Sequence, residues 1–255
     1  MMILNGNIIE DNKVILDTGF FFGRGLFETI LVKDKPIFLD EHIDRINEGL
    51  KKLNINKIIT KDYFMDNFYK LKQKNCALKL VVTEANTLFS TREIPYTENH
   101  YEKGFSLKLS LIKRNPESHG VYLKTLNYLD NIIEKETASK EGFDEVIFEN
   151  TYGYIAEGST SNIFFIKDNI LYTPSIKCGL LNGIIRKWVI SNFNVIEGNF
   201  TLKDILNSEG AFITNSLLGI MKVSSINNNN IETSSLIKEI KTKYDLYINK
   251  SSCFT

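Results

Sequence analysis

Residues 114–165 read RNPESHGVYLKTLNYLDNIIEKETASKEGFDEVIFENTYGYIAEGSTSNIFF, and two residues in this stretch govern the interpretation of the whole chain. Lys124 follows the apolar residues Val121 and Leu123 and precedes a helix-like segment. A lysine beside apolar residues can be desolvated, which lowers its pKa and makes its amine a nucleophile toward carbonyl groups. Glu157 lies in a turn of small residues, where a carboxylate can face a positively charged partner at close range. Taken alone, each residue is more simply interpreted as a charged side chain on the solvated surface.

Together the two residues form a recognisable motif. Lys124-Thr-Leu-Asn-Tyr-Leu is followed, 33 positions after the lysine, by Glu157-Gly-x-x-Ser-Asn-Ile-Phe. This arrangement resembles the signature of class IV, fold-type IV pyridoxal-phosphate enzymes, which include branched-chain aminotransferases, D-amino-acid aminotransferases and aminodeoxychorismate lyases. The resemblance implies an enzyme that binds pyridoxal 5'-phosphate through Lys124, with Glu157 at the pyridine nitrogen. It also implies a small-molecule substrate and a homodimer.

The same resemblance implies the fold class. We expect an α+β enzyme of two domains, like the D-amino-acid and branched-chain aminotransferases, with the cofactor at the domain interface. The smaller N-terminal α/β domain is expected over residues 1–113, and the larger C-terminal mixed domain, which carries the Schiff-base lysine, over 123–255. A linker is expected at 114–122, because Pro116 breaks strand pairing and Ser118-His119-Gly120 continues the irregular run.

Composition excludes several classes of protein. The chain has 255 residues with 31 basic and 31 acidic side chains, so its formal charge suggests neither a nucleic-acid partner nor a charged membrane surface. Its three cysteines are scattered without a C-x-x-C pair, which argues against disulfides and a metal site and favours the reducing cytoplasm. We find neither a signal-peptide pattern nor an apolar run near the roughly 20 residues of a membrane span.

A glycine-rich run, Asp17–Gly25, precedes the apolar segment that begins at Leu26. Its spacing fits neither the Walker nor the Rossmann phosphate loop, and its ordinary interpretation is a bend where backbone packs closely. The run resembles the family stretch D-R-x-x-x-x-G-D-G-x-F, with Thr18 at the usual Arg and Arg24 at the usual Asp. Thr29 matches the threonine of the lyases and is a candidate for substrate binding.

Residues 41–53 show the three-and-four spacing of an amphipathic helix, with Asp40 as the expected N-cap. Within it, His42-Ile-Asp-Arg45 resembles the family's H-x-x-R, whose arginine binds the cofactor phosphate with its planar fork. The ordinary alternatives are a structural histidine and a solvated helix charge. Other expected helices cover 61–73, 126–139, 184–193 and 234–248; expected strands cover 77–83, 105–112, 143–149, 152–156, 162–166, 170–172 and 211–214.

The sequence also predicts the local structure of two further segments. Asn5-Gly6 predicts a hairpin because both residues tolerate positive φ. Residues 86–96 are polar and are expected to be irregular.

The resemblance also assigns the remaining contacts of the cofactor and the substrate. The phosphate would meet Arg45, Ser216 and the backbone amides of a helix N-terminus, whose partial positive charge favours anions. Those amides belong to Gly183, Ile184 and Ile185, and Tyr128 would meet the ring hydroxyl. The substrate would meet Arg92, Arg114, Thr29 and Asn215, and the arginines have a physical reason because aminodeoxychorismate carries two carboxylates.

The choice of reaction depends on Ile213-Thr-Asn-Ser-Leu-Leu-Gly-Ile-Met-Lys-Val. This segment resembles the lyase version and lacks the acidic residue of the aminotransferase version, although Lys222 replaces a common Pro. We therefore expect a 4-amino-4-deoxychorismate lyase that makes 4-aminobenzoate and pyruvate for folate biosynthesis. An aminotransferase acting on D- or branched-chain amino acids with 2-oxoglutarate stays open, and a non-catalytic pyridoxal-phosphate-binding protein is the third alternative.

Overall fold

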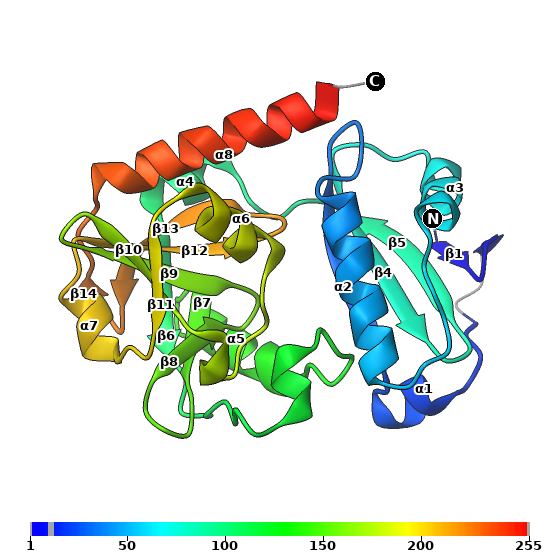
Figure 1. The fold of residues 1–255 in the computed structure, drawn as a ribbon, viewed down its shortest axis with the longest axis horizontal. Helices are drawn as coiled ribbons and strands as arrows, with labels where there is room; N and C mark the ends of the chain where they lie inside the picture. Colours follow the sequence, from blue (N-terminus) through cyan, green and yellow to red (C-terminus); the bar gives the residue numbers. More distant parts are fainter. Residues whose placement is uncertain (1, 10–12, 254–255) are drawn as a thin grey trace. The chain divides into compact units, whose positions relative to one another are not determined.

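The computed structural model describes residues 2–9 and 13–253, and the chain forms two compact units of mixed α and β structure (Figure 1). The first unit is built from the described residues of 1–95, 123–127 and 248–255, and the second from 96–122 and 128–247. The expected α+β fold of two domains is confirmed. The division falls at Pro95 and not at 113, because the strand Phe105–Leu109 pairs within the sheet of the second unit.

The first unit contains a five-stranded antiparallel sheet in the order β2-β1-β5-β4-β3. Its strands are β1 (Met2–Leu4), β2 (Asn7–Ile9), β3 (Gly25–Val32), β4 (Cys76–Thr83) and β5 (Thr87–Arg92). Its helices are α1 (Thr18–Phe22), α2 (Leu39–Lys52) and α3 (Lys61–Leu71). The predicted hairpin is confirmed: β1 pairs with β2, and Asn5 and Gly6 have φ of 48° and 84°.

Helix α2 covers one face of this sheet (Figure 1). Alternate residues of β3 point toward the helix, and the spacing of apolar residues on α2 matches them, so the two surfaces bury each other. The buried cluster includes Leu26, Ile30 and Val32 from β3 and Ile43, Ile46 and Leu50 from α2.

Two predictions in the first unit are wrong. Asp40 is not the N-cap of α2: the helix begins at Leu39, after Phe38 in the left-handed region at φ 55°. Asp40 and Glu41 instead lie in the first turn, where negative charge is favourable to the helix dipole. Residues 86–96 are not wholly irregular, since β5 lies between β1 and β4 with Phe89 in the core. Its polar residues lie on both faces of the strand, so no apolar alternation marks it in the sequence.

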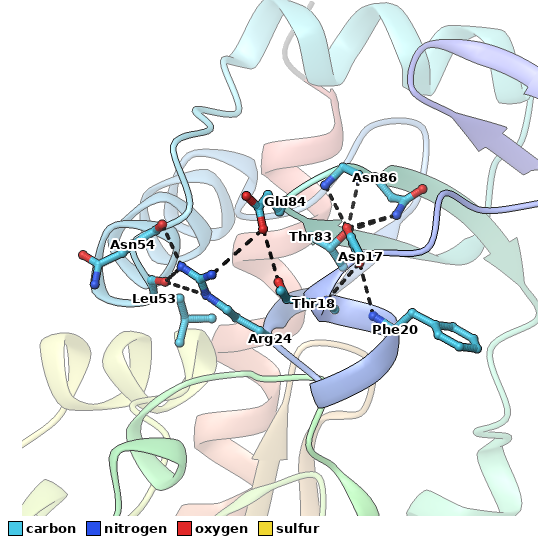
Figure 2. Close-up of polar contacts among 11 residues, drawn as sticks. Asp17, Thr18, Phe20, Arg24, Leu53, Asn54, Thr83, Glu84 and Asn86 are labelled. Atoms are coloured by element: carbon cyan, nitrogen blue, oxygen red, sulfur yellow. Dashed lines mark hydrogen bonds and ion pairs between the residues drawn. The ribbon is translucent and has the colours of Figure 1, made fainter.

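The glycine-rich run Asp17–Gly25 forms a bend at which backbone packs closely (Figure 2). Its interpretation as a bend is therefore confirmed. Asp17 caps α1 by accepting hydrogen bonds from the Gly19 and Phe20 amides at 2.9 and 3.2 Å. Its other oxygen accepts from the Thr83 hydroxyl and the Ala85 amide, so the carboxylate joins the run to the turn between β4 and β5.

Arg24, which stands where the family has Asp, anchors the other end of this bend (Figure 2). Its guanidinium donates to the carbonyls of Leu53 and Asn54 at the C-terminal end of α2, at 2.8 and 3.0 Å from Nη2. A cation is favourable at this end of a helix, because the last carbonyls carry partial negative charge.

The second unit contains a nine-stranded sheet in the order β11-β10-β9-β12-β13-β6-β7-β8, with β14 paired to β13. Its strands are β6 (Phe105–Leu109), β7 (Glu145–Glu149), β8 (Ile155–Gly158), β9 (Asn162–Lys167), β10 (Ile170–Pro174), β11 (Val195–Gly198), β12 (Gly210–Asn215), β13 (Gly219–Ile226) and β14 (Asn229–Asn230). The pairs β6–β7, β6–β13 and β10–β11 are parallel, and the others are antiparallel.

The remaining helices are α4 (Glu98–Lys103), α5 (Leu129–Lys140), α6 (Ile184–Asn192), α7 (Leu202–Leu206) and α8 (Ser235–Cys253). Helix α5 was expected from residue 126 but begins at Leu129. The preceding backbone is extended, because Leu126 donates to the Gly25 carbonyl at 3.0 Å and Thr125 bridges to Leu26. Within the described residues, no helix is both long and apolar enough to cross a membrane.

Candidate active site

Lys124 lies in a short extended segment, Leu123–Asn127, beside the edge strand β3. The Phe27 amide donates to the Lys124 carbonyl at 2.9 Å, which fixes the register of this segment. The Lys124 ammonium Nζ lies 4.4 Å from the centroid of the Phe27 ring, a distance at which a cation is attracted to an aromatic face. The lysine therefore has a defined position on an apolar, aromatic surface.

The same face of the sheet carries two residues predicted to bind substrate. Thr29 follows Phe27 by two positions in β3, so both side chains point to that face, and Thr29 pairs with Lys79 of β4. Arg92 pairs with Ala77, two residues before Lys79, and belongs to this face too. Lys79 Nζ lies 4.9 Å from the centroid of the Phe27 ring, so Lys79 and Lys124 share one aromatic neighbour.

Sequence analysis missed Lys79. Partial burial and the charge of nearby Arg92 lower the pKa of its ammonium. The available signal was a single lysine in the middle of the otherwise apolar strand β4, where Lys79 is the exposed position.

Arg45, predicted to bind phosphate, lies in a buried ionic cluster with Glu28 and His42. Its Nε and Nη2 donate to the two oxygens of the Glu28 carboxylate at 2.7 and 2.6 Å. His42 Nδ1 lies 2.7 Å from Glu28 Oε2. Burial raises the pKa of Glu28, but the charge of Arg45 and the hydrogen bond from His42 outweigh it and lower that pKa to about 2. Glu28 was not singled out from the sequence, although it interrupts the apolar row formed by Leu26 and Ile30.

Glu157 is the next-to-last residue of β8 in the second unit and is buried. Its Oε2 accepts a hydrogen bond from the Leu181 amide at 3.0 Å, and its Oε1 lies 3.6 Å from Arg114 Nε. The Arg114 guanidinium lies over the Phe148 ring, 3.9 Å from its centroid, and is itself buried. Arg114, predicted to meet the substrate, thus lies beside Glu157, and its substrate role stays a prediction.

The turn that follows Glu157 is fixed by a second buried carboxylate, which sequence analysis also missed. Glu145 accepts hydrogen bonds from the hydroxyls of Ser159 and Thr160. The Ser159 carbonyl in turn accepts from the Tyr128 hydroxyl and from Asn131 Nδ2, both at 2.6 Å. Burial raises the pKa of Tyr128, and so does the charge of Glu157. Tyr128 is therefore a neutral phenol held at this turn.

The predicted phosphate-binding amides lie at the start of α6. Gly183 is the N-cap residue and makes no side-chain cap, so the amides of Ile184 and Ile185 have no acceptor within the helix. A Cβ on Gly183 would lie 2.1 Å from Asn162 Oδ1, which explains the glycine. Asn162 Nδ2 donates to the Leu181 carbonyl at 2.8 Å, so the strand after Glu157 supports the loop that leads to α6.

Asn215 is the last residue of β12, and Ser216 lies in the turn between β12 and β13. Asn215 Oδ1 accepts from the amides of Leu217 and Leu218, both at 2.9 Å, and this closes the turn. The side-chain oxygen of Asn215 thus has a structural task, and its substrate contact stays a prediction.

The side chains of each unit suit pyridoxal phosphate chemically. The first unit has a primary amine against an aromatic face and an arginine whose Nη1 is not used by Glu28. The second has a buried carboxylate, a phenol and an uncapped helix N-terminus. In the described part of the chain, no group of three or more His, Cys, Asp or Glu side chains is arranged to hold a metal ion.

Known proteins are similar to this chain in sequence and in fold. Aminodeoxychorismate lyase of Bacillus subtilis is 30% identical over 89% of this chain and 86% of that protein. A putative branched-chain-amino-acid aminotransferase of Methanocaldococcus jannaschii is 30% identical over 94% of each chain. The crystal structure of a putative 4-amino-4-deoxychorismate lyase from Legionella pneumophila is 29% identical, with a TM-score of 0.84, and the match covers 93% of this chain and 96% of that one.

A family model described as amino-transferase class IV matches residues 25–226, which include Lys124, Glu157 and all the other predicted site residues. Members of this family are enzymes that use pyridoxal phosphate. The chain belongs to the class IV aminotransferase family of pyridoxal-phosphate-dependent enzymes.

Proposed function

We propose that this enzyme is a 4-amino-4-deoxychorismate lyase that releases pyruvate and 4-aminobenzoate. One observation carries the proposal: Lys79 and Arg92 lie on the sheet face that also carries Phe27 and Thr29. Two cations suit a substrate with two carboxylates, because each carboxylate leaves water only when a donor replaces its hydration. The similarity to the Bacillus subtilis and Legionella proteins supports the same choice.

The proposed roles follow from the chemistry of each side chain. Pyridoxal phosphate, when bound, supplies an electron sink for the charge that develops on the substrate carbon bearing nitrogen. Lys124 holds the cofactor and, once its amine is free, removes the proton from that carbon. Glu157 would hold a proton at the ring nitrogen, and Tyr128 would contact the ring hydroxyl. Arg45, Ser216 and the first amides of α6 would bind the phosphate.

In the lyase reaction, loss of this proton is followed by cleavage of the carbon–oxygen bond of the enolpyruvyl ether. The leaving enolpyruvate takes up a proton and becomes pyruvate, while the six-membered ring becomes aromatic. Arg92, Lys79 and Thr29 would orient the substrate, so that the proton to be removed faces Lys124.

An aminotransferase acting on D- or branched-chain amino acids is the second candidate, and the similarity to the Methanocaldococcus jannaschii protein favours it. Both reactions begin with the same proton removal, so Lys124 and Glu157 serve either one. They differ in what the remaining residues must bind: a lyase needs sites for one dicarboxylate, whereas an aminotransferase must admit two substrates in turn.

The assay that separates the two candidates follows pyruvate release from aminodeoxychorismate and, separately, amino transfer from D-alanine or L-leucine to 2-oxoglutarate. We expect pyruvate at a rate well above that of amino transfer. Amino transfer without release of pyruvate would establish the second candidate instead.

The identity of the cofactor lysine is tested by borohydride reduction of the holoenzyme and peptide mapping. We expect the label on Lys124. Lys79 is the informative internal control, because its ammonium lies over the same Phe27 ring. A label on Lys79, Lys135 or Lys140 would show that the assignment is wrong.

A further inference from the structure

A buried carboxylate faces the arginine that we propose for the phosphate. Glu28 is 1% exposed and points to the same side of β3 as Leu26, Ile30 and Val32. An ionised group in such an apolar row costs several kcal/mol of desolvation unless partners compensate it. Arg45 and His42, three residues apart on α2, supply that compensation from one turn of the helix.

The geometry of this pair restricts the guanidinium. Arg45 uses Nε and one hydrogen of Nη2 for the two carboxylate oxygens, at 2.7 and 2.6 Å. This two-bond contact fixes the plane of the guanidinium as well as its position. The hydrogens of Nη1 and the second hydrogen of Nη2 then form the outer edge, which is the part left to bind an anion.

His42 holds the carboxylate in this orientation. Burial lowers the pKa of His42, so the imidazole is neutral, and its Nδ1–H donates to Glu28 Oε2 at 2.7 Å. Its Nε2 is buried and has no hydrogen-bond partner among the described residues. The histidine therefore acts as a hydrogen-bond donor to Glu28 and not as a second cation.

We infer that Glu28 is a positioning residue for phosphate recognition: it aims the outer edge of Arg45 at the phosphate of the cofactor, and His42 fixes Glu28. The inference rests on the proposed role of Arg45 in phosphate binding. Since Glu28 already balances the charge of Arg45, recognition depends on the direction of the remaining N–H donors more than on net charge.

The test compares two ligands of the full-length enzyme after removal of its cofactor. Pyridoxal phosphate and pyridoxal differ only in the phosphate, so the ratio of their affinities isolates phosphate recognition. Glu28→Gln keeps the size of the side chain but replaces one acceptor oxygen by an NH2 group. This NH2 group would face an N–H donor of Arg45, so one of the two hydrogen bonds between the side chains would be lost. We expect about a tenfold loss of affinity for pyridoxal phosphate, because charged hydrogen bonds depend strongly on direction. Affinity for pyridoxal should not change.

Two controls separate positioning from loss of structure. Asn47 lies on the same helix and exchanges two hydrogen bonds of 2.9 Å with the backbone of Ile59, so Asn47→Ala weakens the unit without touching Arg45. Its affinity ratio should equal that of the wild type. In an Arg45→Met background, Glu28→Gln should have no further effect on either ligand.

The inference is wrong if Glu28→Gln weakens both ligands equally, or if its effect persists in the Arg45→Met background. Glu28→Asp, which keeps the charge but shortens the side chain, provides a milder variant if the glutamine variant does not fold; it should weaken pyridoxal phosphate alone. A wild-type enzyme that bound both ligands equally would refute the phosphate role of Arg45 itself. If the wild type prefers pyridoxal phosphate to pyridoxal and Glu28→Gln has the same preference, the inference is refuted. The proposed function would not be affected by that result.

Discussion

At the scale of single residues, Glu157 shows how a carboxylate is kept buried by fixed partners. The Leu181 amide donates to one of its oxygens at 3.0 Å, and Arg114 Nε lies 3.6 Å from the other. A group of this kind can act on a ligand without having to reorganise, and preorganised charge is the largest contribution to many enzymatic rates.

Glu157→Gln should retain the cofactor but lose most turnover, because an uncharged amide no longer favours the protonated ring nitrogen. A loss of about 3 kcal/mol in transition-state stabilisation is expected, which is roughly a hundredfold in kcat. The measurement is kcat in either candidate reaction, with cofactor content determined from the absorbance spectrum. Glu141→Gln is the matched control, since that carboxylate is 49% exposed and pairs with Lys108 at the surface. Equal turnover in the two variants would exclude a role for Glu157.

His42 makes stability depend on pH in a predictable direction. Burial lowers the pKa of His42 from its ordinary value of 6.5 in the folded enzyme, and the charge of Arg45 lowers it further. Glu28 and Glu41 raise this pKa but do not cancel the effect of burial. Below pH 6.5 the unfolded chain therefore binds a proton that the folded chain does not, and the free energy of unfolding falls as the pH decreases. The slope from this one group is at most about 1.4 kcal/mol per pH unit.

His42→Asn keeps a donor near the position of Nδ1 but cannot titrate. Urea unfolding of both proteins between pH 5 and 8 should show a smaller loss of stability in the variant on the acidic side. Glu28 does not contribute to this difference, because its pKa of about 2 keeps it ionised over the whole range. Parallel pH profiles for the two proteins would mean that folding does not change the pKa of His42.

At the scale of elements, the segment that carries Lys124 depends on a close approach to β3. Gly25 begins that strand, and its carbonyl accepts from the Leu126 amide at 3.0 Å. A Cβ on Gly25 would lie 2.7 Å from Leu126 Cδ1, 2.8 Å from Thr83 Cγ2 and 2.9 Å from the Val82 carbonyl oxygen. The glycine is required because three neighbours, one of them backbone, occupy the space of a side chain.

Gly25→Ala should therefore destabilise the enzyme by about 1–3 kcal/mol, the usual cost of overpacking a filled interior. It should also slow the reaction of Lys124 with pyridoxal phosphate, because Leu126 is displaced two residues from the lysine. Urea unfolding and the rate of cofactor incorporation measure the two effects. Gly120→Ala is the control, since its nearest neighbour would be Ser118 Oγ at 3.7 Å. No difference between these variants would refute the account.

At the scale of the whole molecule, we expect a homodimer. Phe20, Phe21 and Phe22 in α1 are 64%, 61% and 75% exposed, and Val14, Ile15 and Leu16 just before them are exposed too. Six large apolar residues within nine positions form the kind of patch that soluble monomers rarely leave in water. A second copy of the chain is the partner that the family resemblance implies.

Light scattering at micromolar concentration should give twice the mass of the chain. Phe21→Asp with Phe22→Asp should shift the equilibrium toward the monomer, because burying two new carboxylates in an interface is unfavourable. A monomeric wild-type protein with full activity would refute the prediction. The matched control is the exposed Tyr69→Asp, on α3, which should leave the mass unchanged.

Local patterns in the sequence were enough to predict the features that depend on neighbours along the chain. Apolar spacing predicted α2, alternation over residues 105–112 predicted β6, and the motif around Lys124 and Glu157 led to the family. These signals are local, since a helix repeats after three or four residues and a strand after two.

The contacts between groups far apart in the chain could be found only from the fold. Glu28 and Lys79 are single charges within apolar strands, and nothing near them in sequence identifies Arg45 or Phe27 as their neighbours. The late start of α5 has the same cause, because the backbone before it pairs with β3 almost a hundred residues away in the chain. The buried charge of Glu28 is tolerated only because the fold brings Arg45 and His42 of α2 against β3.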